Sequence, residues 1–93
     1  METKPLFNLG QIVATPKAIG ALIDAGDRFE VLVDRHQNGD WGEIDLQDHA
    51  ENTIAIIRGL RLMSVYTLSN GTKLWIITEA DRSSTCLLLP EEY

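Results

Sequence analysis

The feature that most constrains this chain is a tight-turn sequence between two apolar segments in its C-terminal third. Asn70-Gly71 separates segments 62–68 and 73–79, which are rich in β-branched and aromatic residues. Asn and Gly adopt positive φ angles readily, so this dipeptide between apolar segments is a strong hairpin signal. A third apolar segment, 84–89, follows a polar turn. The sequence therefore predicts a three-stranded antiparallel meander.

A two-residue loop at this turn would place Ser69 opposite Thr72 and Tyr66 opposite Trp75. Successive residues of a strand point to opposite faces, so this register divides the side chains into two sets. The set expected to face the core is Met63, Val65, Thr67, Leu74, Ile76 and Thr78. The other set is Ser64, Tyr66, Lys73, Trp75, Ile77 and Glu79. Two alternatives remain for Tyr66 and Trp75, namely burial under other segments or a partly open aromatic binding face.

Two kinds of signal predict the elements before the meander. Alternating apolar residues predict a strand over residues 7–14, and capping residues predict three helices. Thr and Asp cap helix starts, Pro fits the first turn, and Gly stops a helix in the left-handed conformation. The expected starts are Thr15-Pro16, an Asp27-to-Glu30 capping box and Asp45, and the expected stops are Gly26, Asn38-Gly39 and Gly59. The apolar stripes expected to face inward are Ile19, Leu22 and Ile23, then Phe29, Leu32, Val33 and His36, then Leu46, Ala50, Ile54 and Ile57.

The element order is thus β-α-α-α-β-β-β, which indicates a single α+β domain over residues 1–93 with the meander packed on helices. We expect the first strand to join the sheet at its edge or beside the last strand. A chain of this length supports one modest hydrophobic core.

Composition limits the function classes. The net charge of −6 argues against nucleic-acid binding through a general basic surface. It suits a basic or nucleic-acid-binding protein partner, and a surface charged for solubility explains it equally well. No apolar run reaches a membrane-spanning length, and the first ten residues do not resemble a signal peptide, so we expect a cytoplasmic protein without membrane association. The single cysteine, Cys86, and only two histidines predict no disulfide, no metal site and no cofactor.

Polar residues near the second helix and the second meander turn suggest two kinds of site. Trp41 lies in a Gly-Asp-Trp-Gly loop, which either presents an indole and the Asp40 carboxylate or plugs the core with Trp41. Convergence of His36 with Asp40 or Glu79, and of Arg82 or Arg35, would give an acid/base pair beside a cation, as in a small metal-independent nuclease or another hydrolase. An ordinary cluster of salt bridges has the same composition. The alternative for Asp81 and Arg82 is an ordinary hairpin connection.

Three segments resemble a group of small bacterial proteins of plasmids and other mobile elements, labelled "plasmid-related protein" and sometimes "type I restriction endonuclease subunit M". They are LFNLGQIVATPKAIGAL, RHQNGDWGEID and RLMSVYTLSNGTKLWIITEADRSSTCLLLPEEY. The resemblance covers nearly the whole chain and departs most over residues 25–33. It implies an association with mobile DNA, and through it with host restriction or CRISPR defence. It brings no catalytic residue with it, and 93 residues cannot hold a cofactor-binding methyltransferase fold.

Two functional hypotheses follow. The first is a non-enzymatic acidic binding protein of a mobile element, an inhibitor of a host defence system that acts by protein–protein contact, with a binding face of Tyr66, Trp75, Trp41, Glu79, Asp81 and Arg82. The second is a small nuclease or other hydrolase that uses His36, Asp40, Glu79 and Arg82. A homodimer formed through an exposed sheet edge is a further alternative.

Overall fold

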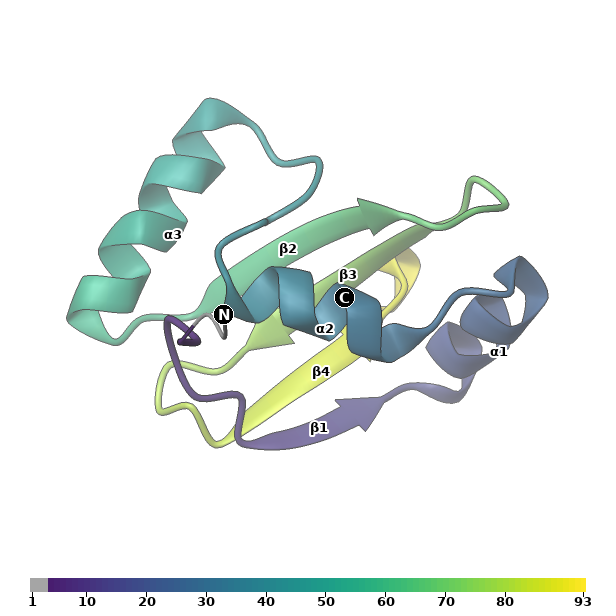
Figure 1. Ribbon diagram of the computed structural model, residues 1–93, viewed down its shortest axis with the longest axis horizontal. Helices are drawn as coiled ribbons and strands as arrows, with labels where there is room; N and C mark the ends of the chain where they lie inside the picture. Colours follow the sequence, from purple (N-terminus) through teal and green to yellow (C-terminus); the bar gives the residue numbers. More distant parts are fainter. Residues whose placement is uncertain (1–3) are drawn as a thin grey trace.

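The computed structural model describes residues 4–93 and shows the predicted α+β class and element order (Figure 1). The elements are β1 (Gln11–Ala14), α1 (Pro16–Ala25), α2 (Phe29–Gln37), α3 (Leu46–Arg58), β2 (Leu62–Thr67), β3 (Lys73–Thr78), β4 (Ser84–Leu88) and a short 3-10 helix η1 (Pro90–Glu92). The predicted caps of α1 and α3 are confirmed, because the Thr15 hydroxyl and the Asp45 carboxylate accept from the backbone at each helix start. The first strand is shorter than expected because Gly10, with φ 65°, bends the chain before it.

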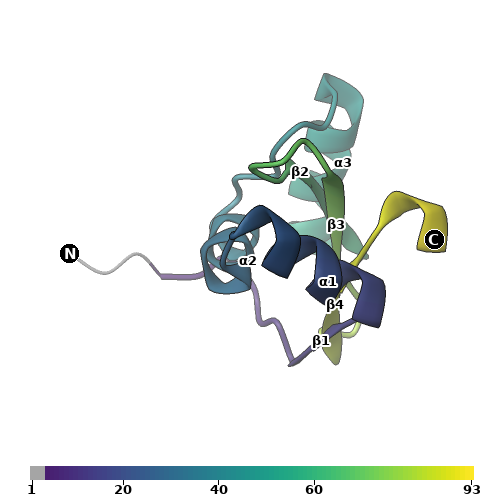
Figure 2. The ribbon, with the colours of Figure 1, turned by 90° about the vertical axis from the view of Figure 1, so that its right-hand side faces the viewer.

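The four strands form one sheet in the order β1-β4-β3-β2. Strands β2, β3 and β4 are antiparallel, as predicted, and β1 runs parallel to β4 at the edge. Helix α2 lies over one face of this sheet, whereas η1 lies against the other face (Figure 2). Helix α3 stands beside β2, on the side of the sheet away from β1 (Figure 1).

The buried side chains form two neighbouring clusters. The larger fills the space between α1, α2 and the sheet, and consists of Ala18, Leu22, Leu32, Val33, Tyr66, Leu68, Leu74, Ile76 and Leu87. The smaller lies between the N-terminal segment, α3 and β2, and consists of Phe7, Trp41, Ala55 and Leu62.

The predicted hairpin register is wrong by one residue. Tyr66 is paired with Leu74 and Val65 with Trp75, because the loop has three residues rather than two. The hydrogen bond from the Leu68 N–H to the Thr72 carbonyl closes this loop, and Gly71 supplies its positive φ. A shift of one residue exchanges the two faces of a strand, so Tyr66 is buried beneath α2 while Trp75 lies on the opposite face.

The predicted inward stripes are only partly correct. In α2, three of the four expected residues are buried and Phe29 is exposed. In α1, Ala18 and Leu22 are buried, whereas Ile19 and Ile23 are exposed. In α3 the whole expected stripe, Leu46, Ala50, Ile54 and Ile57, is exposed, and the helix is buried through Asn52 and Ala55 instead.

The predicted capping box of α2 is also wrong. The N-cap is Arg28, whose side chain caps nothing. The Asp27 carboxylate instead accepts hydrogen bonds from the backbone N–H and the hydroxyl of Ser69, and these bonds lower the pKa of Asp27. Asp27 therefore ties the α1–α2 turn to the β2–β3 loop.

Candidate functional site

His36 lies on the inner face of α2 and is completely buried. Its Nδ1 atom is 2.5 Å from the Ser64 hydroxyl, and its Nε2 atom is 2.9 Å from the Thr78 hydroxyl. The Thr78 hydroxyl is 2.8 Å from that of Thr85, which donates to the Leu9 carbonyl. A row of polar groups therefore crosses the core from β2 to the N-terminal segment.

The direction of these hydrogen bonds fixes the tautomer of His36. Thr85 gives its proton to the Leu9 carbonyl, so it accepts from Thr78. Thr78 must then accept from Nε2–H of His36, which leaves Nδ1 to accept from Ser64. Burial lowers the pKa of His36 to about 4, because the imidazolium would lose its hydration. His36 is thus a neutral, fully bonded core residue.

Trp41 fills the core, which is the second of the two predicted alternatives. Its indole is 4 % exposed, stacks on Phe7 with a centroid separation of 6.1 Å, and meets His36 edge-on. The neighbouring Asp40 carboxylate faces outward and forms an ion pair of 2.7 Å with Arg35, whose hydrogen bond lowers the pKa of Asp40. The Asp40 carbonyl accepts the Tyr66 hydroxyl at 2.6 Å, and burial raises the pKa of Tyr66 to about 12.

The remaining predicted residues stabilise the β3–β4 turn and its surroundings. Arg82 has a φ of 61°, and its guanidinium donates to the carbonyls of Leu60 and Ala55 and of the turn itself. The Asp81 carboxylate accepts the Ser83 N–H, as in an ordinary hairpin connection. Glu79 lies 3.6 Å from Arg61. Arg82 is separated from His36 by the Phe7 ring, which contacts both.

The structure therefore brings neither predicted set of site residues together. His36 is closed off by its hydroxyl partners, and Asp40, Glu79 and Arg82 each bind a different group. Tyr66 and Trp75 lie on opposite faces, and Trp75 packs edge-on against Tyr93 at 5.3 Å. A single aromatic binding face as predicted does not form.

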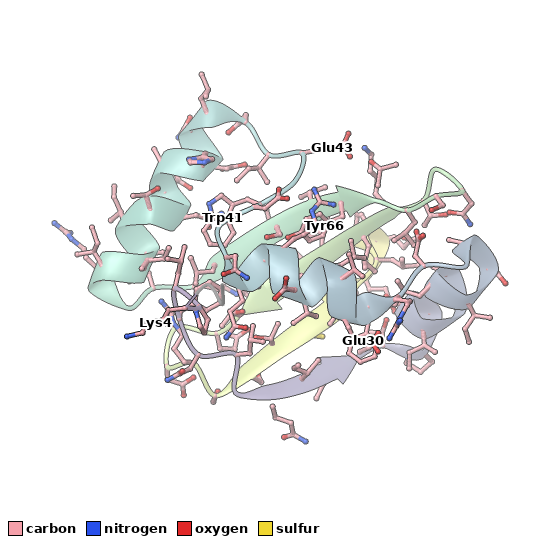
Figure 3. The ribbon with its side chains drawn as sticks, viewed as in Figure 1. Lys4, Glu30, Trp41, Glu43 and Tyr66 are labelled. Atoms are coloured by element: carbon pink, nitrogen blue, oxygen red, sulfur yellow. The ribbon has the colours of Figure 1, made fainter. Side chains whose placement is uncertain are left out.

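The two edges of the sheet differ in whether their outward backbone groups are hydrogen-bonded. On β2, the outward backbone groups are occupied: Asn52 pairs with both the N–H and the carbonyl of Met63, at 3.2 and 2.8 Å. The Val65 N–H donates to the Trp41 carbonyl at 3.0 Å, and the Val65 carbonyl accepts from the Glu43 N–H at 2.7 Å. Figure 3 shows Trp41 and Glu43 along the outer side of β2. This edge is covered.

The outer edge of β1 carries no such cover. The N–H groups of Gln11 and Thr15 donate to the carbonyls of Ser83 and Leu87, so alternation turns the N–H and carbonyl groups of Ile12 and Ala14 away from the sheet. Among the described residues, no strand or loop pairs with these groups (Figure 1). The strand contains no charged residue and no proline, the usual devices that protect an exposed edge.

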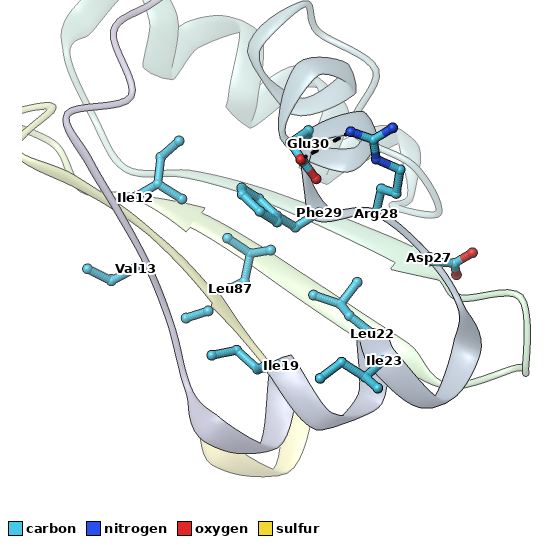
Figure 4. A pocket seen from close by; sticks show the side chains of 11 residues that line it. Ile12, Val13, Ile19, Leu22, Ile23, Asp27, Arg28, Phe29, Glu30 and Leu87 are labelled. Atoms are coloured by element: carbon cyan, nitrogen blue, oxygen red, sulfur yellow. Dashed lines mark hydrogen bonds and ion pairs between the residues drawn. The ribbon is translucent and has the colours of Figure 1, made fainter.

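An apolar groove of about 540 Å³ adjoins this edge, between β1, α1 and the start of α2 (Figure 4). Its wall includes Ile12, Ile19, Ile23, Phe29, Leu22 and Leu87. The Arg28–Glu30 ion pair and the Asp27 carboxylate lie at its rim. Ile12 and Phe29 are each 42 % exposed, so their side chains are available to a ligand.

This groove is not predicted from the sequence, because Ile19, Ile23 and Phe29 are expected in the core. Apolar residues at helical spacing look alike whether they face a sheet or a groove. The uncharged strand Gln11–Ala14 was the available signal, since an edge strand that is not paired normally carries charge.

Comparison with protein-family models, curated proteins and solved structures finds no match to this chain. Within residues 4–93, no group of three or more His, Cys, Asp or Glu side chains is placed to hold a metal ion. None of the helices in the same range is long and apolar enough to cross a membrane.

Proposed function

We propose that this protein functions by binding another protein, which adds an extended segment to the open edge of β1 and places an apolar side chain in the adjoining groove. Backbone groups at a free edge supply the affinity in this mode of recognition, and side-chain pockets beside the edge supply the specificity. The observation that carries the proposal is that the outward backbone groups of Ile12 and Ala14, which have no partner among the described residues 4–93, lie beside the apolar groove.

The geometry suits a strand that runs along β1. Ile12 and Val13 both border the groove, but neighbouring residues of a strand alternate, so the Ile12 side chain lies on the face of the sheet that α2 covers and the Val13 side chain points to the opposite face. A partner segment with alternating apolar and polar residues would therefore place apolar side chains beside Ile12 and Phe29. The groove is lined mainly by apolar groups, which makes desolvation of such a side chain favourable.

The partner we propose is basic. The net charge of −6 attracts cationic segments over long range and raises their rate of encounter. Taken with the resemblance to mobile-element proteins, this chemistry favours a partner that is a nucleic-acid-binding protein of a cytoplasmic host defence system. This protein would inhibit that partner by binding to it. The proposed action needs no catalytic group.

The experiment compares Ile12→Pro with Ile12→Ala as baits for affinity purification from the lysate of the cells that carry the gene. Both substitutions remove the Ile12 side chain, but only proline removes the outward N–H. Proline is tolerated at an edge position whose N–H faces solvent. A captured basic protein is then titrated against each variant, and the affinity of Ile12→Pro is expected to be at least about tenfold below that of Ile12→Ala, the effect of one lost hydrogen bond.

Equal affinities of the two variants for the captured protein would contradict strand addition, and failure of wild type to hold any basic partner would contradict the proposed function. Trp75→Ala is the matched control for the other face of the sheet. Its expected result is full retention of the partner, because Trp75 faces away from the groove.

A further inference from the structure

Helix α3 carries its apolar side chains on the surface. Leu46, Ala50, Ile54 and Ile57 recur at intervals of four, four and three residues, which places them on one face of the helix. That face points away from the protein, since Leu46 is 91 % exposed and Ile57 is 80 % exposed. A helix of a monomeric protein normally turns its apolar stripe toward the core. Here the most apolar face of α3 has no partner in the described residues.

The outward orientation of this stripe is fixed by specific contacts. Asn52, on the opposite face of α3, holds both backbone groups of Met63, and Ala55 is buried against Phe7, Trp41 and Leu62. The Ala55 carbonyl also accepts from Arg82. Rotating α3 to bury its stripe would break all of these contacts. The stripe is therefore presented outward by the fold itself.

We propose that α3 joins two copies of this chain, with the two helices antiparallel across a twofold axis near the middle of the helix. In that arrangement Leu46 of one copy lies beside Ile57 of the other, and Ala50 lies beside Ile54. A self-complementary patch is what a twofold interface requires. The stripe satisfies this condition because the large Leu46 and Ile57 at its ends meet each other, and the small Ala50 of one copy faces the larger Ile54 of the other.

The charges on and around α3 select the antiparallel arrangement. Its start is acidic, with Asp45 at the N-cap and Asp48 in the first turn, whereas Arg58 lies in its last turn. An antiparallel pair brings the acidic start of each copy beside the basic end of the other, and the two helix dipoles also oppose each other. A parallel pair would place like charges together. The same division of charge argues against a uniformly basic partner on this face.

The dimer leaves the proposed partner site free, because α3 lies beside β2 and therefore at the opposite edge of the sheet from β1 (Figure 1). Each dimer would present two grooves, so a partner with two copies of the recognised segment would gain avidity. The inference rests on α3 alone and does not depend on the proposed function.

The test is sedimentation equilibrium of wild type, Ile57→Lys and Ile23→Lys up to about 1 mM, a concentration at which even a weak interface associates. Both isoleucines lie in the last turn of a helix and are highly exposed, at 80 % and 73 %, so the two variants are closely matched. Wild type and Ile23→Lys are expected to approach twice the monomer mass of 10.4 kDa. The dissociation constant of Ile57→Lys should rise at least about a hundredfold, since a twofold interface contains the substitution twice.

A monomeric wild type at every concentration would overturn the proposal, and so would a dimer unaffected by Ile57→Lys or one lost in Ile23→Lys. The antiparallel arrangement has its own readout. Under mild oxidation, a mixture of Leu46→Cys and Ile57→Cys should form a mixed disulfide, whereas Leu46→Cys alone should not form one through residue 46. The reverse pattern would overturn the antiparallel geometry. Wild type, oxidised in parallel, accounts for any product of Cys86.

Discussion

The two edges of this sheet are treated in opposite ways. At β2, the side chain of Asn52 and the backbone of residues 41–43 occupy the outward groups of Met63 and Val65. At β1, no residue in the range 4–93 bonds to the outward groups of Ile12 and Ala14, which lie beside an apolar groove. The difference teaches that hydrogen bonds to outward backbone groups occur at the edge that fixes the structure. They are absent, among the described residues, at the edge where we infer that a partner binds. The covered edge should accordingly control stability, and the open edge should control binding.

The largest effect is expected from Gly42→Ala in the segment that covers β2. Gly42 has a φ of 73°, and an added Cβ would lie 2.0 Å from the Val65 carbonyl oxygen, so the bridge to β2 would have to separate. We expect a loss of about 4 kcal/mol in the free energy of unfolding, from strain and the broken bridge together. Urea denaturation measures it. Gly26→Ala is the control, because Gly26 has a similar φ but open space around it, and it should cost only about 1 kcal/mol.

Acid should lower the free energy of unfolding of the protein through His36, which bonds to Ser64 of β2 in the core. The unfolded chain binds a proton on this residue below its ordinary pKa of 6.5, whereas the folded chain does so only below about 4. Between these values the unfolded state holds more protons, so stability falls as the pH is lowered from 6.5 to 4, by about 3 kcal/mol in total. Thermal or urea unfolding at several pH values measures this slope.

His36→Gln is the control for that slope. Glutamine can keep hydrogen bonds to Ser64 and Thr78 but does not titrate, so the dependence between pH 6.5 and 4.5 should flatten. A slope that is equally steep in His36→Gln would show that other groups cause it, and the assignment of a neutral buried His36 would be wrong.

A smaller loss is expected from Asn52→Ala. The substitution leaves the N–H and the carbonyl of Met63 without their partner and loosens α3 on β2, which should cost about 2 kcal/mol. Gln47→Ala provides the comparison, because Gln47 lies on the same helix, is exposed, and bonds to the exposed Glu51 one turn further along the helix. It should change the free energy of unfolding by less than about 0.5 kcal/mol. Equal effects of the two variants would mean that the Asn52 amide does not secure the edge.

The smallest effect on stability is expected at the open edge. Ile12→Lys replaces a side chain that is 42 % exposed, and the lysine stem can still cover part of the groove. The midpoint of urea unfolding should shift by the equivalent of less than about 1 kcal/mol, while the affinity for the partner should fall because a charge enters the apolar groove. A strongly destabilised Ile12→Lys would show that β1 is part of the stabilising core rather than a binding edge.

The local signals in the sequence predicted the elements well and their packing less well. Thr15-Pro16 and Asp45 set the starts of α1 and α3 correctly, because capping depends on nearby residues alone. The hairpin register was wrong because Asn70-Gly71 fits both a two-residue and a three-residue loop. The longer loop prevails since it buries Tyr66 and places its hydroxyl on the Asp40 carbonyl, a contact between distant segments.

The functional surfaces were the least predictable part. The stripe of α3 was expected in the core because its spacing matches a buried face, but Asn52 turns that helix the other way. His36 was singled out correctly as a residue of the inner face of α2, yet its role depends on three hydroxyls from three different strands. Such contacts join segments that are distant in the sequence, so a local sequence pattern does not predict them.

Amide hydrogen exchange of the free protein, followed residue by residue by NMR, tests the contrast between the two edges most directly. The amides of Met63 and Val65 should exchange slowly, because Asn52 and Trp41 accept from them. The amides of Ile12 and Ala14 should exchange fast, and should become protected once a partner segment binds. Slow exchange of Ile12 and Ala14 in the protein without a bound partner segment, or fast exchange of Met63 and Val65, would contradict this account.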